Sequence, residues 1–505
     1  MWRNKTMKLT VIGAGSLGFT RILLTDILSV KELQKNTQIS FTDINEKNLD
    51  MVTQLCQRDI DFNGLDIRIE ATTDRRQALK NANYVIVAVR VGGLEAFETD
   101  VDIPLKYGID QCVGDTLCAG GIMYGQRGIA EILNFCKDIR EVAAENCIML
   151  NYANPCTMLT WAANVYGKVF TIGLCHGVQG AHKQLADILG LKKEELDYTC
   201  VGVNHQSWFI SLKHNGEELT GKLLEAFEKR PDIIRTEKVR FDMLKRFGYY
   251  MTESNGHSSE YLPWYRKNLD EIKDWIAYDD WINGQTGGYL RVCIEGRNWF
   301  EYDFPNFMKE PPKVYEPASR GVEHGSYIIE SLETGKIYKG DFNFMNHGNI
   351  MNLPEGCCVE GPCFVDGSGF HFPVVGDMPS GCAAVCSASV WTQKLAVEAA
   401  VKGDVSILKQ AMMMDSLVGA CCNPNQISQM TDEMLIAQEK WLPQYKQGIQ
   451  EAKARIAQAK KDGTYIKTKE GFLGSTRVKT KTIEDMEKDV EDARRNAAAA
   501  DKAKH

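Results

Sequence analysis

The segment that decides the fold lies near the start of the sequence: Lys8-Leu9-Thr10-Val11-Ile12, then Gly13-Ala14-Gly15-Ser16-Leu17-Gly18. The first five residues form an apolar run typical of a buried strand, and residues 20–28 place apolar side chains at helical spacing. A strand, a tight glycine turn and a helix in this order are typical of the first unit of a dinucleotide-binding sheet.

Three glycines of this turn, Gly13, Gly15 and Gly18, match the spacing of the dinucleotide fingerprint. In that fingerprint the first glycine permits the turn, the second lets the backbone approach a pyrophosphate, and the third lets the helix pack on the strand. A second strand, over residues 38–42, ends at Asp43, whose carboxylate suits ribose hydroxyls and repels a 2′-phosphate. The pattern therefore predicts NAD(H) rather than NADP(H). The alternative is a glycine turn in a doubly wound fold that binds no dinucleotide.

The remainder of the first half alternates strand-like runs at residues 84–89 and 147–150 with a helical pattern at residues 126–144. This alternation predicts an α/β fold with a Rossmann-type doubly wound parallel sheet, like that of lactate and malate dehydrogenases. Aromatic-rich helices and loops from about residue 180 predict a second, mixed α+β domain. That domain is expected to contain a strand at residues 356–365 and helices at residues 384–401 and 432–441.

We therefore expect three units: an NAD-binding Rossmann domain at 7–180, a substrate- and metal-binding α+β domain at 181–445, and a charged helical or disordered tail at 446–505.

The composition favours a globular enzyme in a reducing compartment. The chain has 505 residues, 44% of them hydrophobic and 25% charged, and a formal net charge of -8, which gives no basic field for nucleic acid. Its 16 cysteines are diluted among apolar stretches and are expected to be thiols. Because no apolar run approaches the roughly 20 residues of a membrane span, we predict a cytoplasmic protein with neither membrane nor nucleic-acid partners.

Polar side chains follow several of the predicted strands. Asn154 precedes a proline directly after an apolar strand, where its amide can point into a ligand crevice, although a plain strand-ending turn explains it as well. Cys175 and His205 each follow a short apolar run. Thiolate and imidazole suit a divalent transition metal, but spacing alone leaves open a buried cysteine and an unrelated histidine.

Eight motifs in order along residues 7–445 resemble glycoside hydrolase family 4, and within it most closely the α-galactosidase (melibiase) branch. The motifs that carry this resemblance are Gly13 to Gly18, Gly114-Asp115-Thr116-Leu117, Asn151 to Pro155, Cys175-His176-Gly177-Val178-Gln179, Val203-Asn204-His205, Thr252-Glu253-Ser254 with His257, Ser259-Glu260-Tyr261-Leu262-Pro263-Trp264, and Asn352 to Glu360.

The resemblance implies an NAD- and metal-dependent glycosidase, commonly with Mn2+, which is a recognised exception to hydrolysis by two carboxylates. In this family NAD+ oxidises the C3 hydroxyl of the sugar, which acidifies the C2 hydrogen. A base removes that proton, the aglycone leaves by elimination, water adds, and the hydride returns to C3. The expected substrate is an α-galactoside, a small molecule. Family members that act on α-glucosides or α-galacturonides are the alternatives.

The resemblance also implies roles for individual residues. Cys175 and His205 would bind the metal, Tyr261 would be the base, and Asn154 would bind a sugar hydroxyl or orient a metal-bound oxygen. Asp115 would support acid/base chemistry or sugar binding, with a turn cap as the plain alternative. A free phenol titrates near pH 10, so the base role requires a nearby cation to lower the pKa of Tyr261.

The sequence departs from the family pattern at three places. His176 stands where 6-phospho-α-glucosidases have the aspartate taken as general acid, which argues against a phosphorylated substrate and makes His176 a candidate acid. Cys118-Ala119 replaces the usual Gly-Pro, and residues 346–349 differ from the melibiase counterpart, so both segments are candidates for contact with the sugar. The tail after residue 446 has no recognised counterpart.

Two other classes of protein remain open. A lactate/malate-type NAD-dependent dehydrogenase shares the N-terminal architecture, but it would accumulate NADH and need no metal. An NAD(H)-sensing regulator is the non-enzyme alternative, although no helix-turn-helix or basic segment supports it. Enzymes of this kind are commonly homo-oligomeric, and we expect the same here.

Overall fold

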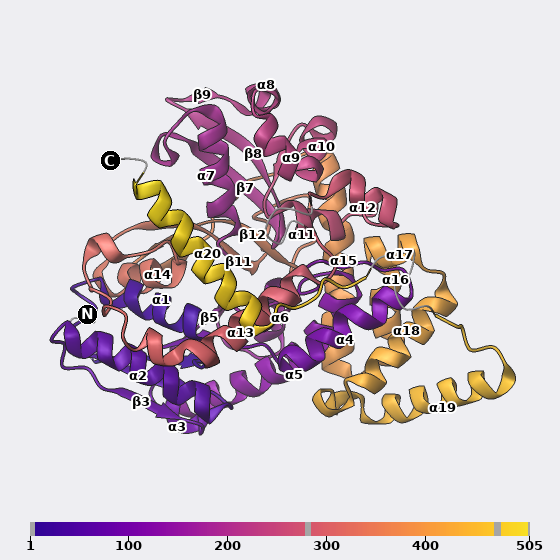
Figure 1. Cartoon of the computed structure of the whole chain (residues 1–505), viewed down its shortest axis with the longest axis horizontal. Coiled ribbons are helices and arrows are strands. Elements are labelled where there is room, and N and C mark those ends of the chain that lie inside the picture. Colours follow the sequence, from indigo (N-terminus) through magenta and orange to yellow (C-terminus); the bar gives the residue numbers. More distant parts are fainter. Residues whose placement is uncertain (1–5, 278–283, 469–475, 503–505) are drawn as a thin grey trace.

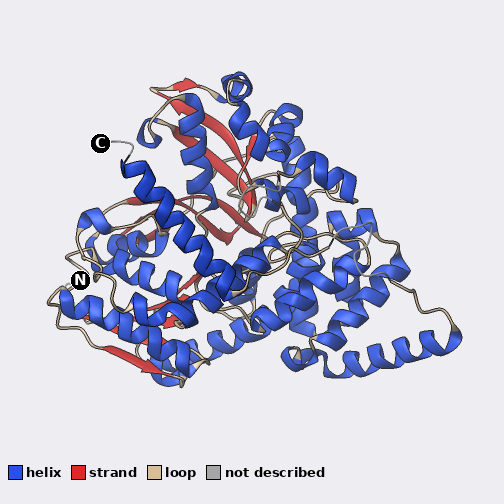
Figure 2. Ribbon diagram, in the orientation of Figure 1, coloured by secondary structure: helices blue, strands red, loops and turns tan. Residues whose placement is uncertain are grey.

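The computed structural model describes residues 6–277, 284–468 and 476–502. In these residues one mixed sheet of 13 strands runs through the molecule, and helices surround it (Figures 1 and 2). The strands are β1 Met7–Ile12, β2 Thr37–Thr42, β3 Ile69–Thr72, β4 Tyr84–Val87, β5 Ile148–Asn151, β6 Thr171–Gly173, β7 Asp197–Val203, β8 Gln206–His214, β9 Glu217–Glu218, β10 Tyr250–Met251, β11 Tyr338–Met345, β12 Cys358–Asp366 and β13 Gly369–His371.

One half of the sheet is parallel, in the order β3-β2-β1-β4-β5-β6. Its central strands β1 and β4 are buried along their whole length, as expected where helices cover both faces. The chain leaves β1 toward β2 on one side and meets β4 on the other, so the order reverses beside β1. In such sheets ligands bind in the crevice at the carboxyl ends of the strands around this reversal. The predicted Rossmann-type fold is confirmed.

The other half is antiparallel and continues the same sheet. Strand β11 joins the parallel half through Asn343 opposite Gly173, and β12, β7, β8 and β10 follow in that order. Strands β6 and β7 are successive in the sequence, yet the β11–β12 hairpin lies between them. The mixed α+β character predicted for the second half is thus observed, within one sheet.

The helices occupy both halves of the chain. The first ten are α1 Leu17–Leu28, α2 Glu46–Phe62, α3 Arg75–Leu79, α4 Gly93–Lys106, α5 Cys118–Val142, α6 Cys156–Val165, α7 Gly177–Leu189, α8 Leu223–Glu228, α9 Pro231–Thr236 and α10 Lys238–Phe247. The later helices are α11 Asn255–Glu260, α12 Leu269–Trp275, α13 Gly288–Phe307, α14 His324–Thr334, α15 Ser380–Lys402, α16 Val405–Met414, α17 Ser416–Cys421, α18 Pro424–Ala437, α19 Lys446–Asp462 and α20 Ile483–Lys502.

Two of the predicted helices differ most from the structure in their bounds. Helix α5 begins at Cys118, eight residues before the expected start, because its first turns are buried on all sides and carry no amphipathic period. The helix predicted at residues 432–441 is divided between α18, which begins at Pro424, and a 3-10 turn at Glu439–Trp441. Pro424 at the first helical position and the Asn423 cap explain the earlier start.

Most of the described C-terminal tail forms two helices, α19 and α20, and the tail returns to the body of the molecule. Helix α20, yellow in Figure 1, packs on α13. Before it, Arg477 lies 3.1 Å from Asp102 of α4, and the N–H of Val478 donates to the carbonyl of Thr286 at 2.9 Å. The tail is therefore attached to the segment that leads into α13.

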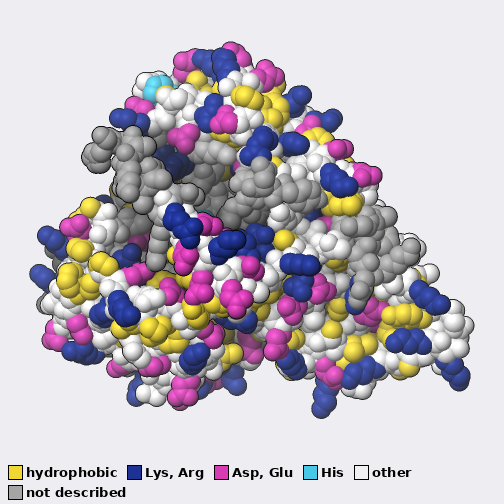
Figure 3. Space-filling view, viewed as in Figure 1, with side chains coloured by type: hydrophobic (Ala, Val, Ile, Leu, Met, Phe, Trp, Pro, Cys, Tyr) yellow, Lys and Arg dark blue, Asp and Glu magenta, His cyan; other side chains and the backbone are white. Residues whose placement is uncertain are grey.

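The surface carries both signs of charge, and on the face shown in Figure 3 basic and acidic side chains are interspersed. Among the described residues, none of the helices combines the length and the apolar composition that a membrane crossing requires. The predicted division at 7–180, 181–445 and 446–505 stays a prediction, because the sheet itself is continuous across residue 180.

Candidate active site

The glycine turn after β1 has a backbone that only glycine fits. Gly13 has φ of +87°, and a Cβ atom there would lie 2.4 Å from the carbonyl oxygen of Ala88. Helix α1 follows at once, and its cap residue Ser16 makes no side-chain hydrogen bond to the first turn. The N–H groups at this helix start therefore have no side-chain cap and can bind an anion.

Asp43 lies at the end of β2 beside this turn. Its Oδ2 accepts the N–H of Gly15 at 2.9 Å, and its Oδ1 accepts the N–H of Asn45 at 2.8 Å. The carboxylate is thus fixed against the turn, in the position expected for a residue that selects a ribose diol.

Gly18 does not have the role that the fingerprint predicts for it. A Cβ atom at Gly18 would meet nothing within 4 Å, so the absent side chain is not what lets α1 pack on the sheet. That part of the prediction is wrong, because the first turn of α1 stands clear of its neighbours at this position.

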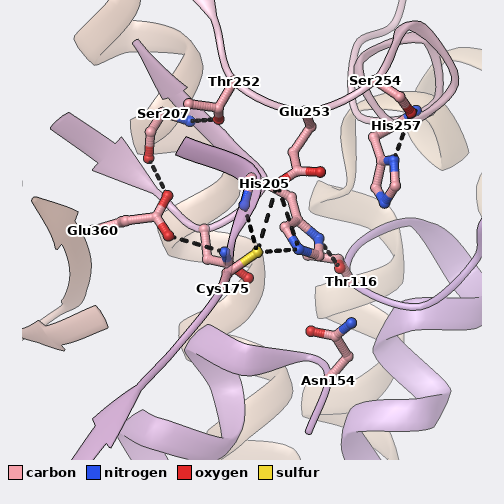
Figure 4. Close-up of polar contacts among 12 residues, drawn as sticks. Thr116, Asn154, Cys175, His205, Ser207, Thr252, Glu253, Ser254, His257 and Glu360 are labelled. Atoms are coloured by element: carbon pink, nitrogen blue, oxygen red, sulfur yellow. Dashed lines mark hydrogen bonds and ion pairs between the residues drawn. The ribbon is translucent and has the colours of Figure 1, made fainter. Parts of the chain in front are cut away.

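A second group of side chains lies where β6, β7 and β10 end (Figure 4). Cys175 Sγ is 3.3 Å from Nε2 of His205, and Oε1 of Glu253 is 3.6 Å from Sγ and 3.8 Å from Nε2. The three donor atoms lie within 4.8 Å of one another, as ligands of one metal ion must. The structure thus brings Cys175 and His205 together and adds Glu253, a residue to which the sequence reasoning gave no role.

The backbone at this site is held in uncommon conformations. His205 is the second residue of a two-residue turn between β7 and β8 and has φ of +68°, and Glu253 has φ of +70°. Such conformations persist for non-glycine residues only where the surrounding structure imposes them, and they cluster at functional sites. Gly177 accommodates this arrangement, since a Cβ atom there would lie 1.6 Å from Oε1 of Glu253.

A second set of possible metal donors, Asp115, His205 and His257, shares one histidine with the first. However, Nδ1 of His205 lies 2.7 Å from the hydroxyl of Thr116, which leaves Nε2 to face Cys175 and Glu253. A metal-bound histidine is usually oriented in this way by a hydrogen bond at its other nitrogen. The geometry therefore favours the set of Cys175, His205 and Glu253.

The charges of this set depend on one another. Burial, together with the charge of Glu253, raises the pKa of the Cys175 thiol well above its usual value. Burial opposes ionisation of Glu253 too, but His205, His257, His176 and Arg240 together outweigh it and lower the pKa of that carboxyl. A bound cation would reverse the effect on the cysteine, because a metal-bound thiol is deprotonated.

Asp115 and Asn154 lie beside the cluster and contact each other. The Asn154 amide donates to Oδ2 of Asp115 at 2.9 Å, and the Thr116 hydroxyl donates to its Oδ1 at 2.9 Å. Arg90, a residue without an assigned role in the sequence reasoning, lies 4.0 Å from the same carboxylate. Asp115 is thus held by polar contacts on several sides, next to the cluster.

Tyr261 is buried, with 2% of its surface exposed, and its ring meets that of His257 edge to face. Burial, followed by the charges of Glu260 and Asp115, raises the pKa of Tyr261 well above its usual value. These two neighbours are acidic, so they do not supply the cation that the base role requires, and that cation stays a prediction. Within this surrounding the phenol keeps its proton unless a bound cation offsets the two carboxylates.

His176 is the cap residue of α7, and two thirds of its side chain is exposed. Its Nδ1 lies 3.4 Å from Glu323, and that carboxylate raises the pKa of the imidazole. A raised pKa keeps more of the imidazole in the protonated form near neutral pH, as a general acid requires.

Glu360 lies behind the cluster and was also missed as a site residue (Figure 4). It accepts hydrogen bonds from Ser207 at 2.7 Å, Asn204 at 3.1 Å and Asn343 at 3.2 Å. These bonds tie the β7–β8 turn, which carries His205, to β11 and β12. The Glu253 and Glu360 motifs are visible in the sequence, but only the fold reveals what they face.

Two of the three departures from the family pattern have structural explanations. Cys118 is fully buried with φ of +62°, a conformation that favours the glycine usual in the branch, and its N–H donates to Asp415 at 2.9 Å. Asn346 is buried as well, and its amide donates to carbonyls of its own loop, that of Ile350 at 3.0 Å among them. Both residues thus contribute to the fold, and the expectation that the two segments contact the sugar stays a prediction.

Comparison with known proteins identifies the family. The model described as "Family 4 glycosyl hydrolase" matches residues 8–191, and that of its C-terminal domain matches residues 200–418. The chain belongs to glycoside hydrolase family 4. It is 52% identical over 494 residues to an α-galactosidase of Rhizobium meliloti (strain 1021), covering 98% of this chain and 99% of the relative. An α-galactosidase of Bacillus subtilis (strain 168) is 32% identical over 443 residues, covering 87% of this chain and 100% of the relative.

Solved structures share the fold of this family 4 enzyme. The 6-phospho-β-glucosidase of Thermotoga maritima, determined with manganese, NAD+ and glucose 6-phosphate, has a TM-score of 0.69 at 22% identity. The match covers 86% of this chain and 99% of the Thermotoga chain. The prediction of a glycoside hydrolase of family 4 is confirmed, and a dehydrogenase or a regulator is no longer needed to explain the glycine turn.

Proposed function

We propose that this family 4 enzyme hydrolyses α-galactosides, using NAD+ and a divalent metal, commonly Mn2+. The observation that carries the proposal is the convergence of Cys175, His205 and Glu253 beyond the carboxyl end of β6, in the same parallel half of the sheet in which β1 ends in the glycine turn. The 52% identity with an α-galactosidase over nearly the whole chain supports galactose as the sugar.

The metal proposal is supported by the chemistry of the donors. Thiolate, imidazole and carboxylate are all ligands of divalent transition metals, and the set leaves further positions for oxygens of the substrate. Glu253 supports it further, because its contacts among the described residues are to the two other donors rather than to a lysine or an arginine.

The NAD+ proposal is supported by the turn after β1. Gly13 shapes it, the uncapped start of α1 offers N–H groups to a pyrophosphate, and Asp43 stands where the ribose of an NAD adenosine is usually bound. A 2′-phosphate at that position would meet the Asp43 carboxylate, so we propose that NADP+ is excluded.

Bound NAD+ would supply the oxidation and later reduction of C3, and the metal would polarise the sugar oxygens. Tyr261 would remove the proton from C2, acting from a site closed to bulk water. Asn154 would hold a sugar hydroxyl, with Asp115 fixing the Asn154 amide through the 2.9 Å hydrogen bond. His176, whose pKa is raised by Glu323, would donate a proton to the departing oxygen.

The decisive experiment is hydrolysis in D2O, because only a mechanism that removes the C2 proton exchanges that hydrogen with solvent. We expect deuterium at C2 of the released galactose and no net accumulation of NADH. Tyr261→Phe should suppress incorporation and turnover together, since the base acts in the step that forms the carbanion. A product without C2 deuterium, formed by Tyr261→Phe at the wild-type rate, would instead support direct displacement.

The substrate is tested with aryl α-glycosides of galactose, glucose and galacturonic acid and with their 6-phosphates, assayed with Mn2+, NAD+ and a reductant. We expect the galactoside to be hydrolysed fastest and the phosphorylated sugars to be poor substrates. Preference for a glucoside or galacturonide would keep the chemistry and change the sugar.

We also propose that the enzyme is a cytoplasmic homo-oligomer that binds neither membranes nor nucleic acid. All sixteen cysteines are free thiols in the structure, which supports a reducing compartment. Light scattering of the purified enzyme in the presence of reductant will give its oligomeric state.

A further inference from the structure

Glu260 makes an unusual set of contacts next to the proposed base. It is the last residue of α11 and is fully buried. Its Oε2 accepts the N–H groups of Cys112 at 2.7 Å and Val113 at 2.9 Å, and its Oε1 accepts the N–H of Gly114 at 2.8 Å. Three successive backbone donors therefore converge on one carboxylate.

The loop that Glu260 holds leads directly to the site. It joins α4 to α5, and the two residues after Gly114 are Asp115 and Thr116. Its carbonyl groups are held from the other side, where the N–H of Gly287 donates to Gln111 at 2.8 Å and the N–H of Tyr289 donates to Cys112 at 3.0 Å.

The charge of Glu260 is partly balanced within the protein. Burial raises the pKa of this carboxyl, whereas the three N–H groups and the Arg266 guanidinium act in the opposite direction. Arg266 is itself bound to Asp110, at the start of the same loop. A fully buried carboxylate whose hydrogen bonds within the described part of the chain all go to one loop is well suited to fixing that loop.

We propose that Glu260 is a positioning residue of the active site: by binding the N–H groups of residues 112–114 it fixes Thr116 and Asp115 with respect to His205 and Tyr261. The influence passes through Thr116, whose hydroxyl lies 2.7 Å from Nδ1 of His205 and so orients Nε2 toward the proposed metal. The inference rests on the proposed function and adds a residue that need not touch substrate, metal or cofactor.

A double-mutant cycle on Mn2+ affinity tests the proposal. Calorimetric titration with Mn2+ compares the wild type, Glu260→Gln, Thr116→Val and the double variant. Loss of a residue that orients a metal ligand typically weakens metal binding about 10- to 100-fold, so we expect each single variant to fall in that range. Because both changes act on the orientation of His205, the double variant should be no weaker than the weaker single variant.

The control is Asp138→Asn. Asp138 is also a buried carboxylate with several hydrogen bonds, here to Arg75 and Arg76, but it lies on α5 and contacts none of the site residues named above. This variant should keep the Mn2+ affinity and the KM and kcat of the wild type, even if its thermal stability falls. Glu260→Asp, which keeps the charge on a shorter side chain, replaces Glu260→Gln if that variant does not fold.

Two results would overturn the inference: wild-type Mn2+ affinity in Glu260→Gln, or a double variant whose loss is the product of the two single losses. If the wild type binds no Mn2+, the proposed function fails, and amide hydrogen exchange then tests the inference alone. Exchange at residues 112–116 should be faster in Glu260→Gln and unchanged in Asp138→Asn. Unchanged exchange in both variants would contradict it.

Discussion

At the proposed dinucleotide end of the site, the glycine turn of residues 13–18 follows β1, and Asp43 follows the adjacent strand β2. At the proposed metal end, the donors follow β6, β7 and β10, and the residues that orient them lie in the loop before α5 and on β12. The first end is formed mainly by backbone N–H groups, and the second by side chains.

Because of this difference, we expect the two ends to tolerate substitution differently. A backbone site depends on the conformation of a few consecutive residues, so it is sensitive to any side chain that disturbs the turn. A side-chain site depends on each donor and on the contacts that orient it. Variants that change one end should therefore leave ligand binding at the other end unchanged.

Cys175→Ser and His205→Ala should each lower hydrolysis roughly a thousandfold or more, because the metal's stabilisation of developing charge is lost. Binding of NAD+, measured by quenching of protein fluorescence, should remain at the wild-type level. A variant that loses NAD+ and Mn2+ together would show that the two ends are not separate. Full activity of the wild type in excess chelator would contradict the metal assignment.

Gly177→Ala should weaken Mn2+ binding about 10- to 100-fold, because the new Cβ atom would displace the carboxylate of Glu253. Gly180→Ala is the matched control, since both residues lie in α7 and a Cβ atom at Gly180 meets nothing within 4 Å. Calorimetric titration should show wild-type affinity for Gly180→Ala. If Gly177→Ala and Gly180→Ala bind Mn2+ with equal affinity, Glu253 is not a metal ligand.

Gly13→Ala should lower the free energy of unfolding by about 1–3 kcal/mol, since alanine is strained at φ of +87° and its Cβ would meet Ala88. Gly18→Ala is the control at the same end, where a Cβ atom has open space. In denaturant unfolding without NAD+, the free energy of unfolding of this control should equal that of the wild type or exceed it by about 0.5–1 kcal/mol, as for other Gly to Ala changes in helices. If Gly18→Ala is less stable than the wild type, the result would support the close helix packing that the fingerprint predicts at Gly18.

Asp43→Asn should produce the smallest change: the ratio of the dissociation constants of NADP+ and NAD+ should fall about tenfold. The amide cannot repel a 2′-phosphate, while the contact to the N–H of Gly15 can be kept by its oxygen. Dissociation constants of both dinucleotides in the cofactor-free enzyme would measure it. Equal binding of NAD+ and NADP+ by the wild type would contradict the selectivity expected of this carboxylate.

The comparison also explains which parts could be predicted from the sequence. The turn at Gly13 and the strands around it follow from consecutive residues, and the predicted strands at residues 8–12 and 38–42 are found within one residue of their observed bounds. Gly18 shows the limit of that approach, because the pattern is met while the packing it is thought to serve is absent.

At the metal end, the resemblance supplied Cys175 and His205, but the residues that complete and orient the pair needed the fold. Glu253 belongs to a motif recognised in the sequence, yet its contact with Cys175 depends on the left-handed backbone at residue 253 and on Gly177 opposite. The charged surroundings of Tyr261 also depend on the fold, since Asp115 lies about 150 positions before Tyr261 in the chain.

The insertion of the β11–β12 hairpin between β6 and β7 also sets an order of events during synthesis of the protein. The parallel strands β1 to β5 are complete once residue 151 has been made, so the dinucleotide turn can fold on a nascent chain. Strands β11 and β12 lie between β6, which precedes Cys175, and β7, which precedes His205, and they are complete only at residue 366. We therefore expect that more than 200 further residues are synthesised before the thiol and the imidazole meet, and that until then both lie at an unfinished edge of the sheet.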